Sequence, residues 1–425
     1  MASETQIHVF DKGNYSNHRL VTLPPTQPEP LPPSSLRLKT KILGLTTNNL
    51  TYANMGFALG WWDTYPIPPT AAAPFHDRDT YATVAGWGYA EVVESTFPGA
   101  KAGDSVFGYV HVGSGTWDVC VCVCVSVSDT GSGSGSGLED GQVLVTSAHR
   151  AHLWKIYNRL QVLPPLRQLE RDHGRDKLGW DALMQVLFGT GYNLSTYGFA
   201  WEDGARIHPS GEGAWSAEEA KLAGAVVVVL NAGGKTGMGF AYAARHGRPQ
   251  DQQPTTIIGV GSESSKALLE ACGFYDEVLL NGDAPKVAEL VGKASPGKVA
   301  LLDFGARPGV FAAYTGALQD TGVPLARFFV GGDNRPAKPQ DLMKARGERG
   351  EGIQVNANTL REKGIDVGGQ KYFEGFDKAW EGFVRQGAIK GTNLVWGEGM
   401  EGWARGWEAF CKDEVRGGEG LVYTL

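Results

Sequence analysis

The stretch A-V-V-V-V-L-N-A-G-G-K-T-G-M-G, residues 225–239, is the part of the sequence that decides the fold. Its first six residues, Ala225 to Leu230, are apolar and have the length of a strand that is buried on both faces. The glycines that follow allow a tight turn. The next segment, Phe240 to His246, has the composition of a helix. The stretch therefore predicts a buried parallel strand, a glycine-rich turn and a helix.

Strand and helix patterns continue to alternate along the next hundred residues. Further strands are expected at Thr255–Val260, Glu277–Leu280, Lys298–Phe304 and Leu325–Val330. Helices are expected between them at Ser264–Cys272, Pro285–Ala294 and Val310–Gln319. This alternation predicts an α/β fold with a doubly wound parallel sheet of the Rossmann type.

The flanking parts of the chain have a different pattern. Strand-like segments dominate the first third of the sequence, at Leu36–Ile42, Leu43–Tyr52, Thr83–Ser95 and Ser105–Val112. Near the end, large apolar side chains, most of them aromatic, recur at steps of three and four, which predicts two amphipathic helices. Their aromatic faces are expected in the core, and a ligand platform is the alternative. The two sets are Phe376, Trp380 and Phe383, then Met400, Trp403, Trp407 and Phe410.

Composition excludes several classes of protein. The 425 residues carry a net charge of −7, which argues against a nucleic-acid-binding surface. The longest apolar run, Leu222 to Leu230, is far shorter than the ~20 residues of a membrane span. Met1 to Phe10 lacks the pattern of a secretory signal. We therefore expect a soluble, cytoplasmic protein without a nucleic-acid or membrane partner.

Three of the five cysteines lie together. Cys120, Cys122 and Cys124 alternate with valine, so that a strand would place all three on one face. A soft-metal or redox site is one interpretation. However, the segment has no nearby Cys-x-x-Cys pair or histidine. Small apolar residues on a packed strand face are therefore the favoured interpretation.

The glycine-rich turn after the first buried strand is the strongest functional signal. A turn at this place can receive a dinucleotide pyrophosphate, because glycines allow close approach and helix N–H groups face the anion. Gly234-Lys235-Thr236 resembles the end of a P-loop, but the glycine that a P-loop needs five residues earlier is Val229. A turn without a ligand remains an alternative. The predicted contacts are Ala232, Gly233, Gly234, Lys235, Thr236 and Gly237.

The end of the second strand indicates which cofactor would bind. In Rossmann folds this position contacts the adenosine ribose. The hydroxyls of Ser262, Ser264 and Ser265 and the charge of Lys266 are suited to a 2′-phosphate, which predicts NADPH. Glu263 would favour NAD unless it points to solvent. An ordinary helix N-cap is the competing interpretation of the serines.

Taken in order, these motifs resemble the medium-chain dehydrogenase/reductase superfamily, and in particular its quinone-oxidoreductase-like branch. The segment Gly103-Asp104-Ser105-Val106-Phe107-Gly108 resembles the G-D-x-V-x-G motif of the superfamily. Gly305 and Gly331, in Asp303-Phe304-Gly305 and Val330-Gly331, resemble further cofactor contacts of the branch. A related domain-of-unknown-function family is more similar still, in Asn48–Ala53, Trp62–Pro66, Gly86–Ala90 and Tyr157-Asn158.

The resemblance implies an arrangement of domains. It implies a GroES-like β-rich domain at 1–195, which contains a flexible Gly-Ser insertion at 131–137. A Rossmann NADP-binding domain would follow at 196–335, and residues 336–425 would return to the first domain. Substrate and nicotinamide would then meet in the cleft between the domains, and a homodimer is expected by analogy.

The resemblance also bears on metal binding. Zinc-dependent members carry a cysteine ligand where this chain has Thr46 and Thr47, and they carry a Gly-His-Glu run that this chain lacks. We therefore predict no metal. A developing oxyanion would then need phenol or amide donors. The candidates are Tyr52, Asn49 and Tyr157, of which the first two are expected near a strand end facing the cleft. Each is equally consistent with a buried, satisfied polar residue.

The sequence thus predicts a zinc-independent, NADPH-dependent reductase of a small conjugated carbonyl, enoyl or quinone-like substrate. Two alternatives remain open. The same fold would serve a lyase or another carbonyl-chemistry enzyme without a redox step. It would also serve a non-catalytic protein that binds a nucleotide or a small ligand.

Overall fold

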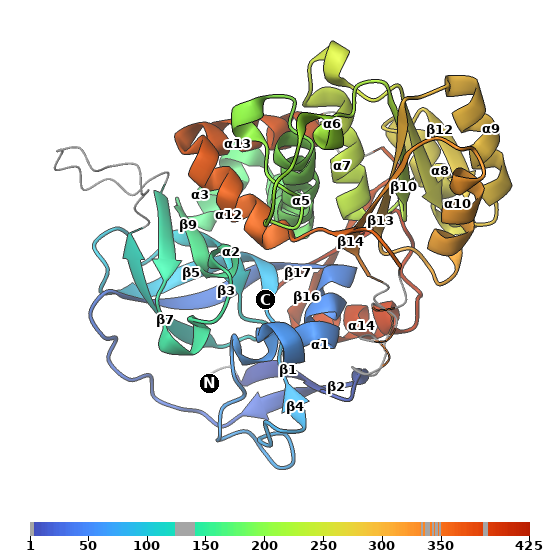
Figure 1. The fold of residues 1–425 in the computed structure, drawn as a ribbon. Helices are drawn as coiled ribbons and strands as arrows, with labels where there is room; N and C mark the ends of the chain where they lie inside the picture. Colours follow the sequence, from blue (N-terminus) through green and yellow to red (C-terminus); the bar gives the residue numbers. More distant parts are fainter. Residues whose placement is uncertain are drawn as a thin grey trace, which may run out of the picture.

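A computed structural model describes residues 4–123, 141–332, 350–385 and 390–425, together with residues 335, 341, 344 and 347. The Gly-Ser run at 131–137 and Cys124 lie outside the described residues. The described chain forms an α/β part and a β-rich part that lie side by side (Figure 1). Both predicted components of the fold are confirmed.

The α/β part is built on a parallel sheet of six strands. Their order is β12-β11-β10-β13-β14-β15, and every neighbouring pair is parallel. This is the 3-2-1-4-5-6 order of a Rossmann fold. The strands are β10 (Ala225–Leu230), β11 (Thr256–Gly261), β12 (Glu277–Leu280), β13 (Lys298–Phe304), β14 (Leu325–Gly331) and β15 (Ile353–Gln354).

Helices cover this sheet on both faces, as the doubly wound pattern requires (Figure 1). The crossover helices are α7 (Lys235–His246), α8 (Glu263–Cys272), α9 (Ala284–Ala294) and α10 (Val310–Gln319). All six residues of β10 are buried, because apolar side chains cover both of its faces. β10 lies at the centre of the sheet, with β11 on one side and β13 on the other.

The β-rich part contains a closed, barrel-like ring of strands. β7 pairs with β8 on one side and with β3 on the other, so the series β3-β5-β6-β9-β8-β7 closes on itself. The strands are β3 (Ser35–Leu45), β5 (Gly86–Ser95), β6 (Ser105–Val110), β7 (Thr116–Val123), β8 (Gln142–Val145) and β9 (Arg159–Leu163). A three-stranded sheet lies beside it, formed by β1 (Thr5–Asp11), β2 (Asn14–Leu23) and β4 (Tyr81–Ala82).

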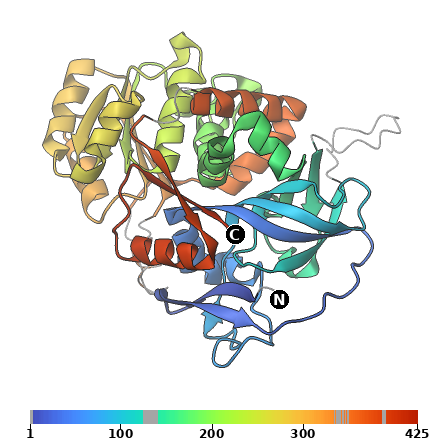
Figure 2. The same cartoon turned by 180° about the vertical axis from the view of Figure 1, so that it is seen from behind.

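The end of the chain returns to the N-terminal sheet. β17 (Glu419–Thr424) pairs antiparallel with β3 and parallel with β16 (Asn393–Glu398). These two strands run across the middle of the view in Figure 2. Between them lies α14 (Gly399–Cys411), whose Trp403 and Trp407 are fully buried, as the aromatic spacing predicts. The domain boundaries themselves stay a prediction.

A group of helices joins the two parts. It comprises α3 (Leu166–His173), α4 (Arg175–Trp180), α5 (Val186–Asn193), α6 (Ala217–Ala220), α12 (Ala357–Gly368) and α13 (Gln370–Arg385). α5 packs tightly on α7, since a Cβ on Gly191 would lie 2.3 Å from the backbone nitrogen of Phe240. Trp380 and Phe383 of α13 are buried against α5, so the aromatic face of this helix also belongs to the core.

Two local predictions are wrong. The strand expected over 43–52 ends at Leu45, and α1 (Thr47–Leu59) begins two residues later. Thr46 stops the strand because its side chain caps the helix, accepting from Asn48 N, while Asn49 Oδ1 accepts from Thr46 N. The expected packing of cysteines on a strand face also fails, because Cys122 is exposed.

Two valines of β7, rather than its cysteines, face the core. Val119 and Val121 are buried, whereas Cys120 is only half-buried and Asp118 is exposed.

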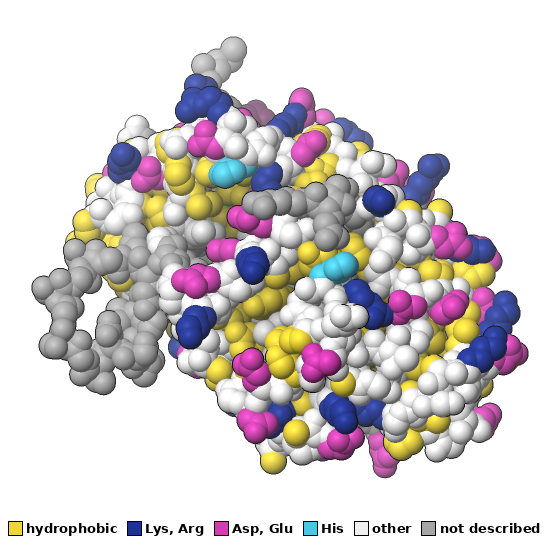
Figure 3. Space-filling view, turned by 90° about the horizontal axis from the view of Figure 1, so that it is seen from above, with side chains coloured by type: hydrophobic (Ala, Val, Ile, Leu, Met, Phe, Trp, Pro, Cys, Tyr) yellow, Lys and Arg dark blue, Asp and Glu magenta, His cyan; other side chains and the backbone are white. Residues whose placement is uncertain are grey.

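The surface of the described residues carries charges of both signs. Acidic and basic side chains of the described residues are interspersed on the face shown in Figure 3. Within the described ranges, no helix is long and apolar enough to cross a membrane.

Candidate active site

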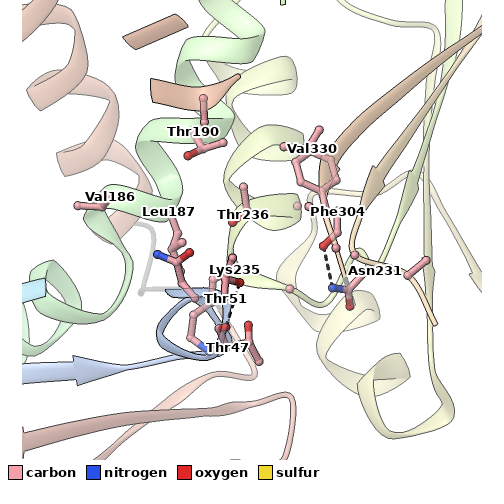
Figure 4. A pocket seen from close by; sticks show the side chains of 18 of the residues that line it. Thr47, Thr51, Val186, Leu187, Thr190, Asn231, Lys235, Thr236, Phe304 and Val330 are labelled. Carbon is pink, nitrogen blue, oxygen red and sulfur yellow. Dashed lines mark hydrogen bonds between the residues drawn. The ribbon is translucent and has the colours of Figure 1, made fainter. Parts of the chain in front are cut away.

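A cleft of about 660 Å³ lies between the α/β part and the β-rich part. One wall is formed by the carboxyl ends of β10, β11, β13 and β14 and by the start of α7. The other wall is formed by α1, by α2 (Lys155–Asn158) and by the start of α12. Figure 4 shows Thr47 and Thr51 of α1, Leu187 and Thr190 of α5, and Lys235 and Thr236 of α7 around this space. The edge at which parallel sheets bind nucleotides therefore opens into the cleft.

The glycine-rich turn between β10 and α7 lines the cleft on the side of the α/β part. Asn231 adopts a left-handed conformation, with φ of 56°, and its Nδ2 donates to the carbonyl of Phe304 at 3.1 Å. α7 begins at Lys235, so the N–H groups of its first turn have no partner within the helix. Five of the six predicted residues line the cleft, namely Gly233, Gly234, Lys235, Thr236 and Gly237. The sixth, Ala232, is fully buried behind them.

Lys235 is the cation of this turn. Its side chain is half-buried, and this removal from water lowers its pKa to about 8. No described carboxylate forms an ion pair with it. An ammonium group that is short of water and lacks a counter-charge has a strong electrostatic preference for an anion in the cleft.

The serine cluster lies at the start of α8. Ser262 is the N-cap, its backbone N–H donates to Ser265 Oγ at 3.0 Å, and its own Oγ lies 2.9 Å from Ser264 Oγ. All three serines line the cleft. The helix-cap interpretation and the ligand interpretation therefore apply to the same residues, because cap hydroxyls retain further hydrogen-bonding capacity.

The predicted cation of this cluster does not reach the cleft. Lys266 is exposed, does not line the cleft, and forms an ion pair with Glu270 at 3.9 Å. Glu263 is also exposed and does not line it. Arg416 lines the cleft instead, from the segment between α14 and β17. The next residue, Gly417, packs on α8, since a Cβ there would lie 3.6 Å from Ser265 Cβ.

Gly305 and Gly331 both line the cleft, at the ends of β13 and β14. Gly305 has φ of 96°, and a Cβ on it would lie 2.5 Å from the carbonyl oxygen of Gly332. A Cβ on Gly331 would lie 2.9 Å from the backbone of Phe304. Both positions therefore need glycine for the two strand ends to lie this close.

The opposite wall carries a network of hydroxyl and amide groups centred on Tyr52 of α1. Tyr52 Oη accepts from Asn48 Nδ2 at 2.6 Å and from Trp87 Nε1 at 2.8 Å. Burial raises the pKa of Tyr52 to about 12. The phenol thus stays protonated at neutral pH.

Tyr157 of α2 lies edge-on to Tyr52, with ring centroids 5.9 Å apart. Burial raises the pKa of Tyr157 well above its usual value, and the Tyr52 hydroxyl adds to this effect. The amide of Asn358, on α12, opposes it. Both tyrosines line the cleft, so the structure brings these two predicted residues together.

Asn49, the third predicted catalytic residue, has a different environment. Its Oδ1 accepts from Thr46 N at 2.9 Å, and its Nδ2 donates to the carbonyl of Ala85 at 3.3 Å. It is 2% exposed and does not line the cleft. Its amide is therefore occupied in holding the start of α1.

Sequence reasoning missed several residues of the cleft. Asn193 ends α5, and Asn358 and Arg361 lie in the first turns of α12. With Arg416, they come from segments without a recognised motif. One local sequence signal could have predicted where α12 begins. Asn356 is its N-cap residue, and its side chain accepts a hydrogen bond from Thr359 N.

A transition-metal site would draw on histidine, cysteine or carboxylate side chains. The described residues that line the cleft include neither histidine nor cysteine. Across the described part of the chain, no group of three or more His, Cys, Asp or Glu side chains is placed to hold a metal ion.

The comparisons with known proteins agree with this architecture. Residues 43–416 match the family described as "Protein of unknown function (DUF2855)", and the chain belongs to that family. No curated protein sequence matches the chain. Many solved structures share its fold at low sequence identity.

Three of these structures illustrate the similarity. CurA from Vibrio vulnificus in complex with NADPH is 14% identical, with a TM-score of 0.52, over 99% of this chain and 98% of that chain. Mycobacterial Rv1454c complexed with NADPH is 15% identical, with a TM-score of 0.54, over 100% of both chains. The mitochondrial 2-enoyl thioester reductase heterodimer of Candida tropicalis is 12% identical, with a TM-score of 0.55, over 99% of this chain and 100% of that chain. At these identities the similarity establishes the fold; the quinone-oxidoreductase-like branch stays a prediction.

Proposed function

We propose that this protein is an NADPH-dependent, zinc-independent reductase of a small conjugated carbonyl or enoyl substrate. The observation that carries this proposal is the cleft. One wall has a glycine-rich turn and a lysine that forms no ion pair with any described carboxylate, and the other wall has two buried tyrosines whose pKa values are raised. Structures of an enoyl thioester reductase and of NADPH complexes share the fold, which supports the choice of reaction and cofactor.

The residues of the first wall fit a dinucleotide. The close packing at Gly233, where a Cβ would lie 2.9 Å from Ser265 Cβ, keeps the turn free of side chains. The first-turn N–H groups of α7 and the ammonium of Lys235 offer donors and charge to a pyrophosphate. Gly305 and Gly331 leave the strand ends bare. NADPH would supply a hydride to the β-carbon of the substrate when it is bound there.

On the second wall, hydrogen-bond counting assigns the proton donor. Tyr52 Oη accepts from Asn48 and Trp87, which occupies both of its lone pairs. With both lone pairs occupied, Tyr52 has none left to accept a hydrogen bond from Tyr157. In our proposal the Tyr157 proton is therefore directed to a substrate oxygen in the cleft. We infer that Tyr157 donates the hydrogen bond that stabilises the developing enolate, and that Tyr52 positions it.

The 2′-phosphate is assigned to the serines of α8 and to Arg416. The serine hydroxyls donate hydrogen bonds, and the exposed arginine supplies the charge that Lys266 was predicted to supply. A charge-assisted hydrogen bond of this kind contributes roughly 1.5–3 kcal/mol, or about ten- to hundredfold in affinity.

The proposal is tested by titrating the full-length protein with NADPH and with NADH, followed by the fluorescence of Trp61 and Trp154 in the cleft. Arg416→Ala is expected to weaken NADPH binding about ten- to hundredfold and to leave NADH binding nearly unchanged. Lys266→Ala is the matched control and is expected to change neither. Absence of dinucleotide binding to the unmodified protein would overturn the proposal. Equal losses in Arg416→Ala and Lys266→Ala would contradict the assignment of the 2′-phosphate.

A further inference from the structure

The substrate end of the cleft contains a partly buried arginine on α12. Arg361 lies one turn into α12 and lines the cleft. Its guanidinium packs over the ring of Phe376, 5.7 Å from the centroid, and lies against Gly189, where a Cβ would be 3.4 Å from Nη1. No carboxylate of the described residues forms an ion pair with it. The Nε atom of Arg361 is buried and has no hydrogen-bond partner among the described residues.

Two neighbouring side chains are also incompletely satisfied. Asn193 is 1% exposed, lines the cleft, and its Oδ1 has no partner among the described residues. The buried hydroxyl of Tyr372 lies close to both Asn193 and Arg361. Burial raises the pKa of Tyr372 and the charge of Asp377 adds to that rise, while Arg361, Asn193 and Arg159 oppose it. Buried polar groups are normally paired, and several unpaired ones in one place indicate a missing ligand.

The missing ligand can be described by its chemistry. An unpaired guanidinium requires an anion, and carboxylates match its planar fork of donors. The first turn of α12, with Ala357 and Asn358 on the cleft, adds the positive end of a helix dipole. A half-turn of the Asn193 amide exchanges Oδ1 for Nδ2 without changing its shape, so that this group can also donate.

We propose that Arg361, Asn193 and the first turn of α12 form a subsite for a carboxylate, and that the natural substrate is a conjugated carbonyl compound carrying a carboxylate group. The assignment of the substrate end rests on the proposed function, since it assumes that the dinucleotide occupies the opposite wall. The subsite itself depends only on the unpaired groups.

Binding of a matched pair of probes tests this without turnover. The pair is 4-oxo-4-phenylbutanoate and its primary amide, which have nearly the same shape and differ in charge. Both are titrated calorimetrically into the full-length protein without a dinucleotide. The acid is expected to bind at least tenfold more tightly than the amide, as a single charge-assisted pair would give. Arg361→Gln is expected to abolish that preference, and Arg361→Lys to retain part of it.

Two further variants complete the design. Arg171→Gln changes an exposed arginine on α3 and is expected to keep the preference. Asn358→Asp adds a negative charge that a helix N-terminus tolerates, so it should fold and still lose affinity for the acid. Failure of the acid to bind, equal binding of acid and amide, or a preference that survives in both Arg361→Gln and Asn358→Asp would overturn the subsite. NADPH titration of the same samples reports on the proposed function separately, because its residues lie on the other wall.

Discussion

At the scale of single residues, Tyr157 carries the proposed chemistry. Tyr157→Phe removes the hydroxyl that we propose to bind the substrate oxygen, and it keeps the ring in its aromatic cluster. We expect kcat to fall about hundredfold or more, as for the loss of other positioned proton donors. NADPH affinity should not change, because the phenol lies on the opposite wall. Steady-state kinetics combined with cofactor titration measures both effects.

Tyr52→Phe provides the contrast to this variant. It leaves the donors of Asn48 and Trp87 without their acceptor, so its main expected cost is stability, about 1–3 kcal/mol. Turnover should fall much less than in Tyr157→Phe. If Tyr52→Phe abolished turnover while Tyr157→Phe remained active, the roles assigned to the two tyrosines would have to be exchanged.

The lowered pKa of Lys235 predicts that cofactor binding depends on pH. Burial lowers its pKa to about 8, so the ammonium is charged below this value and loses its charge as pH rises through it. NADPH affinity should therefore be nearly constant from pH 6 to pH 7 and fall above about pH 8. Lys235→Met should bind more weakly at pH 7 and lose this transition. Identical pH profiles for the two proteins would contradict the role of Lys235.

Lys235 also affects folding. A lysine whose pKa is lower in the folded chain than in the unfolded chain disfavours folding while it is charged. This cost in folding free energy decreases as pH rises from about 8 to the ordinary lysine pKa near 10.4. Lys235→Met should therefore melt at a higher temperature than the unmodified protein at pH 7. Together with weaker NADPH binding, this result would mark Lys235 as a functional residue rather than a structural one.

At the scale of elements, α1 depends on its cap. Asn49 holds Thr46 N and the carbonyl of Ala85, both in buried surroundings. Asn49→Ala should lower the free energy of unfolding by about 1–3 kcal/mol, because it leaves these groups unpaired. Thr47→Ala, at an exposed neighbouring position, should change it by less than about 0.5 kcal/mol. Urea denaturation of both variants measures the difference, and equal costs would contradict the capping role.

The elements also show where sequence reasoning succeeds. β10 and the turn after it were predictable because a buried strand is apolar throughout and glycine marks the turn. α1 was not, because its first residues resemble a strand and its cap, Thr46 with Asn49, lacks the usual glutamate or glutamine of a capping box. Arg361 and Arg416 could not be found either. Their function depends on which distant segments the fold brings to the cleft, and no local pattern records that.

At the scale of the whole molecule, the return of the chain end completes the site. β17 pairs with β3 of the N-terminal sheet, and the segment before it packs Gly417 on Ser265 of α8 and brings Arg416 to the cleft. The wall that we propose for the cofactor is thus assembled from the α/β part and from the last residues of the chain. This explains why the cation for the 2′-phosphate was sought within the α/β segment, at Lys266, and lies elsewhere in our proposal. The homodimer stays a prediction.

Transfer of hydride from the cofactor to a carbon–carbon double bond tests the central claim most directly. The full-length protein is incubated in EDTA with NADPH deuterated at the transferable position and with a panel of conjugated ketones and enoyl thioesters, with and without a carboxylate. The proposal predicts NADPH oxidation and a saturated product that carries one deuterium at the β-carbon, detected by mass spectrometry and NMR. Substrate conversion without NADPH oxidation, or a product without deuterium, would contradict it and would favour a non-redox enzyme with the same fold.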